Sequence, residues 1–408
     1  MVDISIELAG IKFANPLQCG SGQATNRGEK IKKIAIEGKP GAIVTKTLSI
    51  GMGLNWGRGS KIPVLQTWAW TGRQAELGKK SNNKVCVVSC SRGEPFTPED
   101  WFQKEFPVAM EGNVSVIGSV GGAPDMDQWL YLSKACEKAG CAMVELNFGT
   151  PHAHQWGHGA VILYSGFAFE VVKAVKKNVN IPVIVKLPYL SEGDCIRYGK
   201  EMERVGADAL KACMPPGATS IDIETGVPPL GIATRCGIAG GPSHKPLALM
   251  NVYALAQHVS IPIIGSGGVC SGRDAIEHIM AGATAVEICT WMMVKGPKLF
   301  HQVNREIIEW MEGKGYSSLR EIKGKALKYA GREEYEPYVP RVDEGLCTGC
   351  GQCETLCTWV IHSLPAAIRV DQSTKKATVD AKRCEGCGRC YLYCPEDAIL
   401  LKDWAKRS

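Results

Sequence analysis

The feature that most constrains this chain is a pair of matching cysteine runs near its C-terminal end. In each run three cysteines follow at intervals of three residues and a fourth comes four residues later: Cys347, Cys350, Cys353 and Cys357, then Cys384, Cys387, Cys390 and Cys394. This spacing is typical of [4Fe–4S] cluster binding, because three close thiolates hold one cluster and a distant thiolate completes it. A pair of zinc sites is the alternative, but zinc takes four ligands at each site and does not require two interlocked runs.

The two runs resemble those of bacterial two-cluster ferredoxins, in which the fourth cysteine of each run ligates the other cluster. The resemblance implies one cluster on Cys347, Cys350, Cys353 and Cys394, and a second on Cys384, Cys387, Cys390 and Cys357. Glycines between the thiolates would let backbone amides approach the cluster sulfurs. Thr358 follows the first run where Pro395 follows the second, and we expect this difference to change the local backbone and potential but not the ligation.

From Pro16 to about Met311, short apolar runs alternate with longer amphipathic stretches. The apolar runs are β-branched and bounded by Gly or Pro, which is typical of buried parallel strands. The runs include 42–46, 114–118, 143–147, 182–186, 209–212, 262–265 and 285–288, and the amphipathic stretches include 126–139, 167–177, 193–205, 245–258 and 272–281. Roughly eight such units predict an α/β fold of the (β/α)8 TIM-barrel type. An open doubly wound sheet is the alternative, but it would gather the polar strand-end residues at one switch point.

The 408 residues therefore divide into three parts. We expect a barrel over 1–311, a linker over 312–340 and a two-cluster ferredoxin-like domain over 341–408. The linker shows no clear periodicity and contains Pro337 and Pro340.

Composition narrows the partners and the location. The N-terminus has no signal-peptide pattern, and no apolar run reaches the ~18 residues that span a bilayer. The formal charge of +6 is modest and lacks a Lys/Arg block. We therefore expect a cytoplasmic protein with neither a membrane nor a nucleic acid as its partner.

Residues at the ends of the predicted strands have the chemistry of a flavin site. Lys46-Thr47 end the second strand, Asn147 the fourth and Lys186 the fifth, while Gly267-Gly268 follow the seventh. A Gly-Gly turn that opens onto a helix offers N–H groups to a phosphate. A strand-end lysine can place positive charge near the N1–C2 edge of a flavin. Each residue alone has an ordinary explanation, as a solvated lysine or a simple turn, and their joint order along a barrel favours the flavin.

With these motifs in place, the chain resembles the dihydroorotate dehydrogenase-like flavoproteins, in particular the FMN/iron–sulfur subunit of dihydropyrimidine dehydrogenase. The resemblance covers nearly the whole chain. It implies FMN, two [4Fe–4S] clusters, and reduction of a C=C bond or the reverse reaction. It also implies a set of FMN contacts: Gly20, Ser21, Lys46, Thr47, Asn147, Lys186, Gly240, Gly267, Gly268 and Thr290.

The source of electrons is expected to be a separate protein. The chain has no G-x-G-x-x-G following a strand, and so no visible dinucleotide site of its own. The family implies a partner subunit that oxidises NAD(P)H through FAD, and a ferredoxin is the other candidate donor. A homo- or hetero-oligomer is expected.

The chain departs from the family where the proton donor lies. The family has Ser-Cys-Pro with the cysteine as general acid, whereas this chain has Gly149, Thr150 and Pro151. A threonine hydroxyl is a poor acid at neutral pH unless a neighbour relays the proton. His152 and His154 follow in the same loop, and imidazole titrates near neutrality. Thr150, His152 and His154 are the candidate catalytic residues, while a polar surface loop and an adventitious metal site remain alternatives for the histidines.

The pyrimidine contacts of the family are also missing. Met214-Pro215 replaces an Asn-Thr pair, and 70–73 lacks an amide and a carboxylate that the family has there. A site without these groups leaves the polar edges of a pyrimidine unsatisfied. We therefore expect a different small molecule with an activated C=C bond as the substrate. An electron-transfer subunit of a larger complex and a dihydropyrimidine dehydrogenase with an altered site are the alternatives.

Overall fold

The structure is a computed structural model that describes residues 2–50, 68–69, 87–89, 96–122, 124–149, 166–212, 214–218, 221, 223–226, 237–331, 339–361 and 363–400. The chain forms two compact units, Met1–Ala330 and Gly331–Ser408, and each is described by itself.

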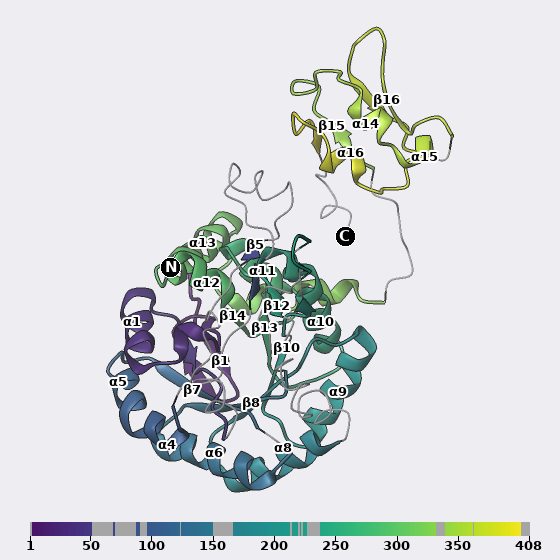
Figure 1. The fold of residues 1–408 in the computed structure, drawn as a ribbon. Helices are drawn as coiled ribbons and strands as arrows, with labels where there is room; N and C mark the ends of the chain where they lie inside the picture. Colours follow the sequence, from purple (N-terminus) through teal and green to yellow (C-terminus); the bar gives the residue numbers. More distant parts are fainter. Residues whose placement is uncertain are drawn as a thin grey trace. The chain divides into compact units, whose positions relative to one another are not determined.

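The first unit contains a closed barrel of eight parallel strands inside a ring of helices (Figure 1). Chain order is also the order around the barrel, and β14 pairs with β3 to close it. The strands are β3 (Leu17–Cys19), β4 (Ala42–Val44), β7 (Ser115–Val120), β8 (Met143–Asn147), β9 (Val183–Lys186), β10 (Ala209–Ala212), β13 (Ile263–Ser266) and β14 (Ala285–Ile288). The predicted TIM barrel is confirmed, and each of the seven apolar runs contributes a strand.

The helices follow the strands as the amphipathic stretches predicted. The ring and its C-terminal extension comprise α1 (Gly28–Gly38), α4 (Pro98–Asp100), α5 (Phe106–Met110), α6 (Met126–Ala139), α8 (Phe167–Asn178), α9 (Glu192–Arg204), α10 (Lys245–Ala256), α11 (Gly272–Met280), α12 (Thr290–Lys295) and α13 (Leu299–Lys314). Local signals explain their ends: the Ser271 hydroxyl accepts from the backbone N–H of Asp274 at the start of α11, and Gly140 ends α6 in a left-handed conformation. Serine N-caps and glycine C-caps satisfy backbone groups that a helix leaves unpaired.

The barrel interior has an apolar floor and a polar upper layer. Besides Ala42 and Val44 of β4, the floor contains one inward residue from each of six further strands: Ile117, Met143, Ile184, Ala209, Ile264 and Ala285. The hairpin of β1 (Ile6–Leu8) and β2 (Ile11–Phe13) adds Leu8 and Phe13 to it. Because side chains two apart on a strand share a face, the next inward residues lie one layer higher. All six of these are polar: Ser119, Glu145, Lys186, Lys211, Ser266 and Glu287.

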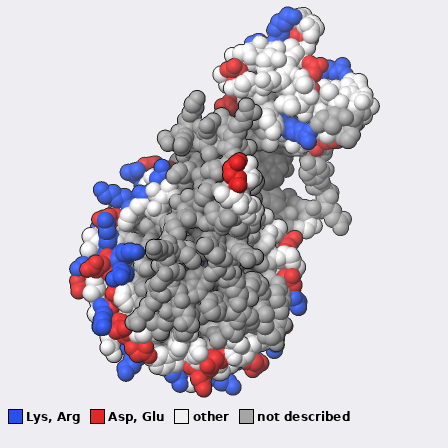
Figure 2. Space-filling model, in the orientation of Figure 1, with Lys and Arg blue, Asp and Glu red and all other residues white. Residues whose placement is uncertain are grey.

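A small antiparallel sheet accompanies the barrel. Its strands run in the order β11 (Gly217–Ala218), β12 (Gly237–Gly240), β6 (Val87–Ser89) and β5 (Trp68–Ala69). Acidic and basic side chains are interspersed along the helical edge of the first unit (Figure 2). Among the described residues, no helix has the length and apolar character that crossing a bilayer requires.

The first unit extends further along the chain than the sequence suggested. Helix α13 runs to Lys314, past the expected barrel end at 311, and two short 3-10 turns follow at Leu319–Glu321 and Lys325–Tyr329. Leu319 and Ile322 are buried in the barrel's hydrophobic core. Residues 312–330 therefore belong with the barrel instead of the linker, because their apolar side chains pack on it.

The second unit is built from short elements around a small core. Two antiparallel pairs, β15 (Arg341–Val342) with β18 (Ile399–Leu400) and β16 (Ile368–Val370) with β17 (Ala377–Val379), flank three short helices. The helices are α14 (Gln352–Thr355), α15 (Thr358–Ile361) and α16 (Arg389–Leu392). The buried core consists of four cysteines, four alanines and two isoleucines. Such a core buries little apolar surface, so ligation of clusters would add much of the unit's stability.

Candidate functional site

The predicted flavin residues lie where the barrel strands end. Gly20-Ser21 follow β3 and Lys46-Thr47 follow β4, while Asn147 and Lys186 are the last residues of β8 and β9 and face each other in register. The carboxyl ends of the strands form the face on which TIM-barrel enzymes carry their active sites.

A chain of hydrogen bonds joins these strand ends. The Asn147 side-chain amide donates to Thr47 Oγ1 at 2.8 Å, and Ser21 Oγ lies 3.3 Å from the same Thr47 oxygen. Thr47 Oγ1 is 3.0 Å from Ser119 Oγ, whose hydroxyl donates to Glu145 Oε1 at 2.9 Å. The chain thus links three predicted flavin contacts to a carboxylate in the barrel interior.

Glu145 belongs to a buried charge cluster that comprises Glu145, Glu287, Lys211 and Lys186. The Lys211 ammonium donates to both carboxylates, at 2.5 Å in the case of Glu287 Oε2, and its side chain is completely buried. Ser266 donates to the second oxygen of Glu287 at 2.9 Å. Lys186 Nζ lies 3.9 Å from Glu145 Oε1. Two ammonium groups balance two carboxylates, which is the condition for keeping charges inside a barrel.

The charge cluster keeps Lys211 and Glu287 ionised. Burial alone would lower the pKa of Lys211, but the two adjacent carboxylates outweigh it and raise that pKa. Burial acts in the opposite sense on Glu287, yet the charges of Lys211 and Lys186 leave the Glu287 pKa lowered. Since Lys211 contacts both carboxylates directly, the longer pairing of Lys186 leaves its ammonium able to hold an anionic group.

Sequence reasoning missed Glu145, Lys211, Glu287 and the serines that bind them. The signal was present, because a charged residue recurs inside three runs that otherwise read as buried strands. The alternation of side chains places all three on the inner face of the barrel. A charged side chain at an inward position of a buried strand needs a partner of opposite charge. Here Glu145 and Glu287 are the partners of Lys211, and Lys186 adds a second positive charge.

The predicted glycines allow close approaches around the same face. A Cβ on Gly20 would stand 2.7 Å from Glu287 Cδ, and one on Gly240 would stand 2.5 Å from Thr290 Oγ1. Gly267 and Gly268 have φ of +123° and +74°, which L side chains rarely adopt. A glycine turn of this kind exposes backbone N–H groups, which suits the phosphate of FMN.

Two further groups border this glycine turn and the end of β14. His278 Nε2 donates to the Gly267 carbonyl at 3.1 Å, and burial lowers the pKa of His278 to about 4. Burial raises the pKa of the Cys289 thiol to about 11, and Glu287 adds to this, while Lys186 and Lys46 oppose it. Lys186 and Lys46 therefore both place positive charge at one end of the barrel. The residues at the strand ends there fit a flavin.

The proton-donor candidates Thr150, His152 and His154 lie outside the described residues. The residue just before them is described: a Cβ on Gly149 would stand 2.4 Å from Met214 Cγ. The apolar Met214 side chain therefore packs beside the start of the loop that carries these candidates. The backbone N–H of Met214 donates to the Leu187 carbonyl at 3.3 Å.

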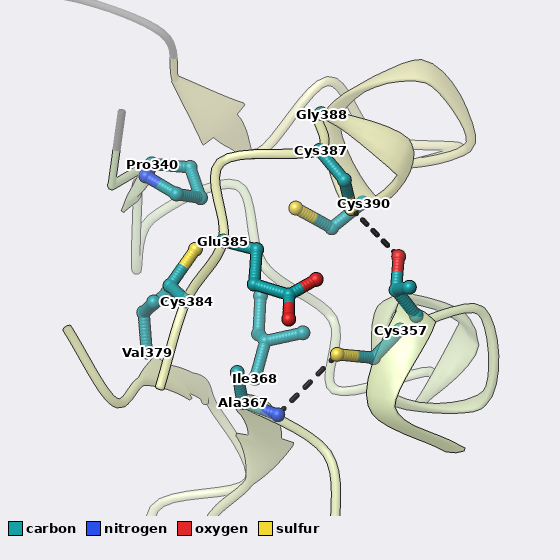
Figure 3. Close-up of a pocket in the computed structure, with 11 residues that line it drawn as sticks. Pro340, Cys357, Ala367, Ile368, Val379, Cys384, Glu385, Cys387, Gly388 and Cys390 are labelled. Carbon is teal, nitrogen blue, oxygen red and sulfur yellow. Dashed lines mark hydrogen bonds between the residues drawn. The ribbon is translucent and has the colours of Figure 1, made fainter. Parts of the chain in front are cut away.

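In the second unit, each set of four cysteines that the ferredoxin resemblance implies lines one hollow. The hollow that we call the Cys387 hollow is lined by Cys357, Cys384, Cys387 and Cys390 (Figure 3). The Cys350 hollow is lined by Cys347, Cys350, Cys353 and Cys394. Their empty volumes are similar, about 400 and about 340 Å³. Four thiols around a hollow of this kind fit a [4Fe–4S] cluster.

The two runs repeat in backbone geometry as well as in spacing. Gly349 and Gly386 have φ of 72° and 69°, and Gly351 and Gly388 have φ of 78° and 71°. Backbone N–H groups donate to sulfurs in both hollows, from Ala367 to Cys357 at 3.3 Å and from Ala377 to Cys347 at 3.4 Å. Hydrogen bonds to the sulfurs stabilise thiolates and tune the cluster potential.

Comparison with known proteins shows which family this arrangement represents. The family model described as "Dihydroorotate dehydrogenase" matches residues 94–311, and "4Fe-4S binding domain" matches residues 377–400. The chain belongs to the dihydroorotate dehydrogenase family. It is an iron–sulfur flavoprotein oxidoreductase by this membership and by its 4Fe-4S domain.

The curated relatives carry the name "Dihydroorotate dehydrogenase B (NAD(+)), catalytic subunit". The protein of Pyrococcus horikoshii is 34% identical over 326 residues, which cover 80% of this chain and 98% of the relative. The protein of Methanosarcina mazei is 35% identical over 323 residues, which cover 78% of this chain and 94% of the relative. About a fifth of this chain thus lies outside the match to either dehydrogenase.

Proposed function

We propose that this chain reduces, or in reverse forms, an activated C=C bond of a small molecule at FMN, with two [4Fe–4S] clusters carrying electrons from a partner protein. The observation that carries the proposal is that each set of four cysteines implied by the crossed ligation lines its own hollow, in a chain whose barrel gathers the predicted flavin residues at one end. Relatives named as dihydroorotate dehydrogenases support chemistry at a CH–CH bond.

The barrel residues would bind and orient the cofactor. Thr47 and Asn147, fixed to each other by a hydrogen bond, would contact the flavin, and Lys186 would hold its anionic edge. The turn at Gly267-Gly268 would receive the phosphate, with Gly20, Ser21, Lys46, Gly240 and Thr290 as the remaining contacts. When bound, FMN supplies hydride exchange at N5 and one-electron exchange with iron–sulfur clusters.

The substrate side would differ from that of a pyrimidine enzyme. Met214 presents an apolar side chain beside Gly149, where a pyrimidine would need donors and acceptors. Addition of two electrons and two protons to the C=C bond requires a proton donor, and Thr150, His152 and His154 are our candidates. The electrons would come from an FAD-containing partner that oxidises NAD(P)H, or from a ferredoxin.

The test is anaerobic mixing of the chemically reduced full chain with candidate oxidants. The panel contains simple enones, enoyl thioesters, uracil, thymine and orotate, and flavin absorbance reports reoxidation. We expect enones or enoyl compounds to reoxidise the flavin in a single turnover and the pyrimidines to leave it reduced. Reoxidation by orotate or uracil would favour the pyrimidine alternative, which the named relatives make the second candidate.

Two other results would replace the proposal. If no small molecule reoxidises the flavin whereas a partner protein does, the chain is an electron-transfer subunit. If anaerobic preparations contain neither flavin nor iron, the redox assignment itself is wrong.

A further inference from the structure

The two hollows differ at one symmetry-related position. This position is the residue directly after the fourth cysteine of each run, beside the hollow that this cysteine helps to line. Thr358 occupies this position after Cys357, and Pro395 occupies it after Cys394. The spacing and the glycine conformations of the two runs otherwise repeat closely.

Thr358 makes a contact that proline cannot make. Its hydroxyl donates to Cys387 Sγ at 3.0 Å, and Figure 3 draws this bond beside the one from Ala367 N to Cys357. Proline has neither a hydroxyl nor a backbone N–H. Thr358 also begins α15 directly after Cys357. Because Thr358 directly follows Cys357, which lines the Cys387 hollow, its hydroxyl is held beside that hollow.

Backbone N–H groups also donate to sulfurs in both hollows. The Cys387 hollow receives the N–H of Ala367, and the Cys350 hollow receives those of Ala377 and Ala398, at 3.4 and 3.3 Å. These three bonds give the Cys350 hollow two backbone donors and the Cys387 hollow one. The Thr358 hydroxyl is a side-chain donor on the Cys387 hollow.

We propose that the Thr358 hydroxyl raises the reduction potential of the cluster on Cys357, Cys384, Cys387 and Cys390. Reduction adds one electron, breaks no bond and needs no proton, so negative charge grows on the cluster and its thiolates. A donor on a thiolate sulfur stabilises that charge. The inference rests on the proposed function for the presence of both clusters, and Thr358 acts through Cys387.

Exposure limits the size of the effect. Cys387 is exposed and Thr358 is half-buried, so water can replace part of the lost hydrogen bond. We expect removal of the hydroxyl to change the reduction equilibrium of this cluster by about tenfold, which is about 59 mV for one electron.

The experiment is an anaerobic redox titration of the full chain with dithionite and mediators, followed by electron paramagnetic resonance. Thr358→Val removes the hydroxyl while keeping the shape, and Thr358→Ser is the matched control that keeps the donor. Thr358→Ala is a second removal variant in case the valine impairs α15. Iron content is measured for every preparation.

The expected result is one potential lowered by about 59 mV in the valine or alanine variant and the other unchanged. The serine variant should keep both potentials near the wild-type values. Unmoved potentials in both removal variants, or an equal shift in the serine variant, would overturn the inference. Failure of the proposed function is distinguishable, because wild-type protein would then contain fewer than about eight irons.

Discussion

The two units place chemistry on the chain in opposite ways. In the second unit, the eight ligand candidates come from two short runs, and each hollow combines three cysteines of one run with the last of the other. In the barrel, the charge cluster draws Glu145, Lys186, Lys211 and Glu287 from four different strands. One site is specified mainly by spacing and the other mainly by topology.

The difference teaches where each site is vulnerable. The second unit has a core of cysteines, alanines and two isoleucines, so its fold would depend on the clusters that we propose the cysteines hold. The barrel has a large core of its own, and its charge cluster is a local cost that must stay balanced. Changes in the first case should therefore remove a cofactor, and changes in the second should alter stability.

The largest expected effect is loss of a cluster across the runs. Cys357→Ala deletes the fourth thiol of the Cys387 hollow, although Cys357 belongs to the other run. We expect iron to fall from about eight to about four atoms per chain and the cluster on Cys347, Cys350, Cys353 and Cys394 to survive. Iron analysis and electron paramagnetic resonance of anaerobic preparations would measure this.

The matched control is Cys270→Ala, which changes a cysteine in the barrel unit. It should keep all of the iron. Cys384→Ala should abolish the signal of the cluster in the Cys387 hollow. If that signal survives in the Cys357→Ala protein, the crossed ligation is wrong and each cluster is held by one run alone.

The next effect concerns balance inside the barrel. Lys211→Met leaves Glu145 and Glu287 with one fewer ammonium at full burial. Breaking a buried pair on one side typically costs about 3–5 kcal/mol of unfolding free energy, whereas replacing both partners is often nearly neutral. We expect the double variant Lys211→Met with Glu287→Gln to recover at least half of the loss. Denaturant unfolding of the full chain, followed by circular dichroism, would measure both.

A less deeply buried pairing provides the comparison. Lys245 binds Asp274 at 2.7 Å and Glu277 at 2.8 Å, but its side chain remains 26% exposed. Lys245→Met should cost only about 1 kcal/mol or less. If Lys211→Met were no more destabilising than Lys245→Met, the buried cluster would not be the electrostatic unit described.

How much of the fold and of each site could be predicted from the sequence also differs between the two units. Seven strands and five helices were predicted because hydrophobic periodicity is a local signal. The cysteine runs could be recognised from their spacing, and the division into two sets came from the resemblance to bacterial two-cluster ferredoxins. The Lys211 cluster was not predicted, because its partners lie 66 and 76 residues away and only barrel closure brings them together. The linker start was placed too early, since Leu319 and Ile322 gain their burial from distant parts of the barrel.

The last expected effect is a pH dependence at the glycine turn. His278 is fully buried, and burial lowers its pKa to about 4. The charge of Lys245 and neighbouring His244 act in the same direction, while the Gly267 carbonyl and Asp274 oppose it. A carbonyl only accepts, so Nε2 carries the proton of the neutral ring. The fold therefore prefers neutral His278, while the unfolded chain takes up a proton below about pH 6.5.

The sign of the effect follows from this preference. The unfolded state binds more protons between about pH 6.5 and about pH 4, so His278 makes the native state less stable as pH falls through that window. The contribution lost is about 3 kcal/mol, and it is fully present above pH 6.5. His278→Gln should flatten this part of the pH profile of unfolding free energy, and His301→Gln, at an exposed position of α13, should not. Equal slopes in all three proteins would mean that carboxylates alone govern the acid side. A flattened slope would show that the turn at Gly267 depends on a neutral imidazole at His278.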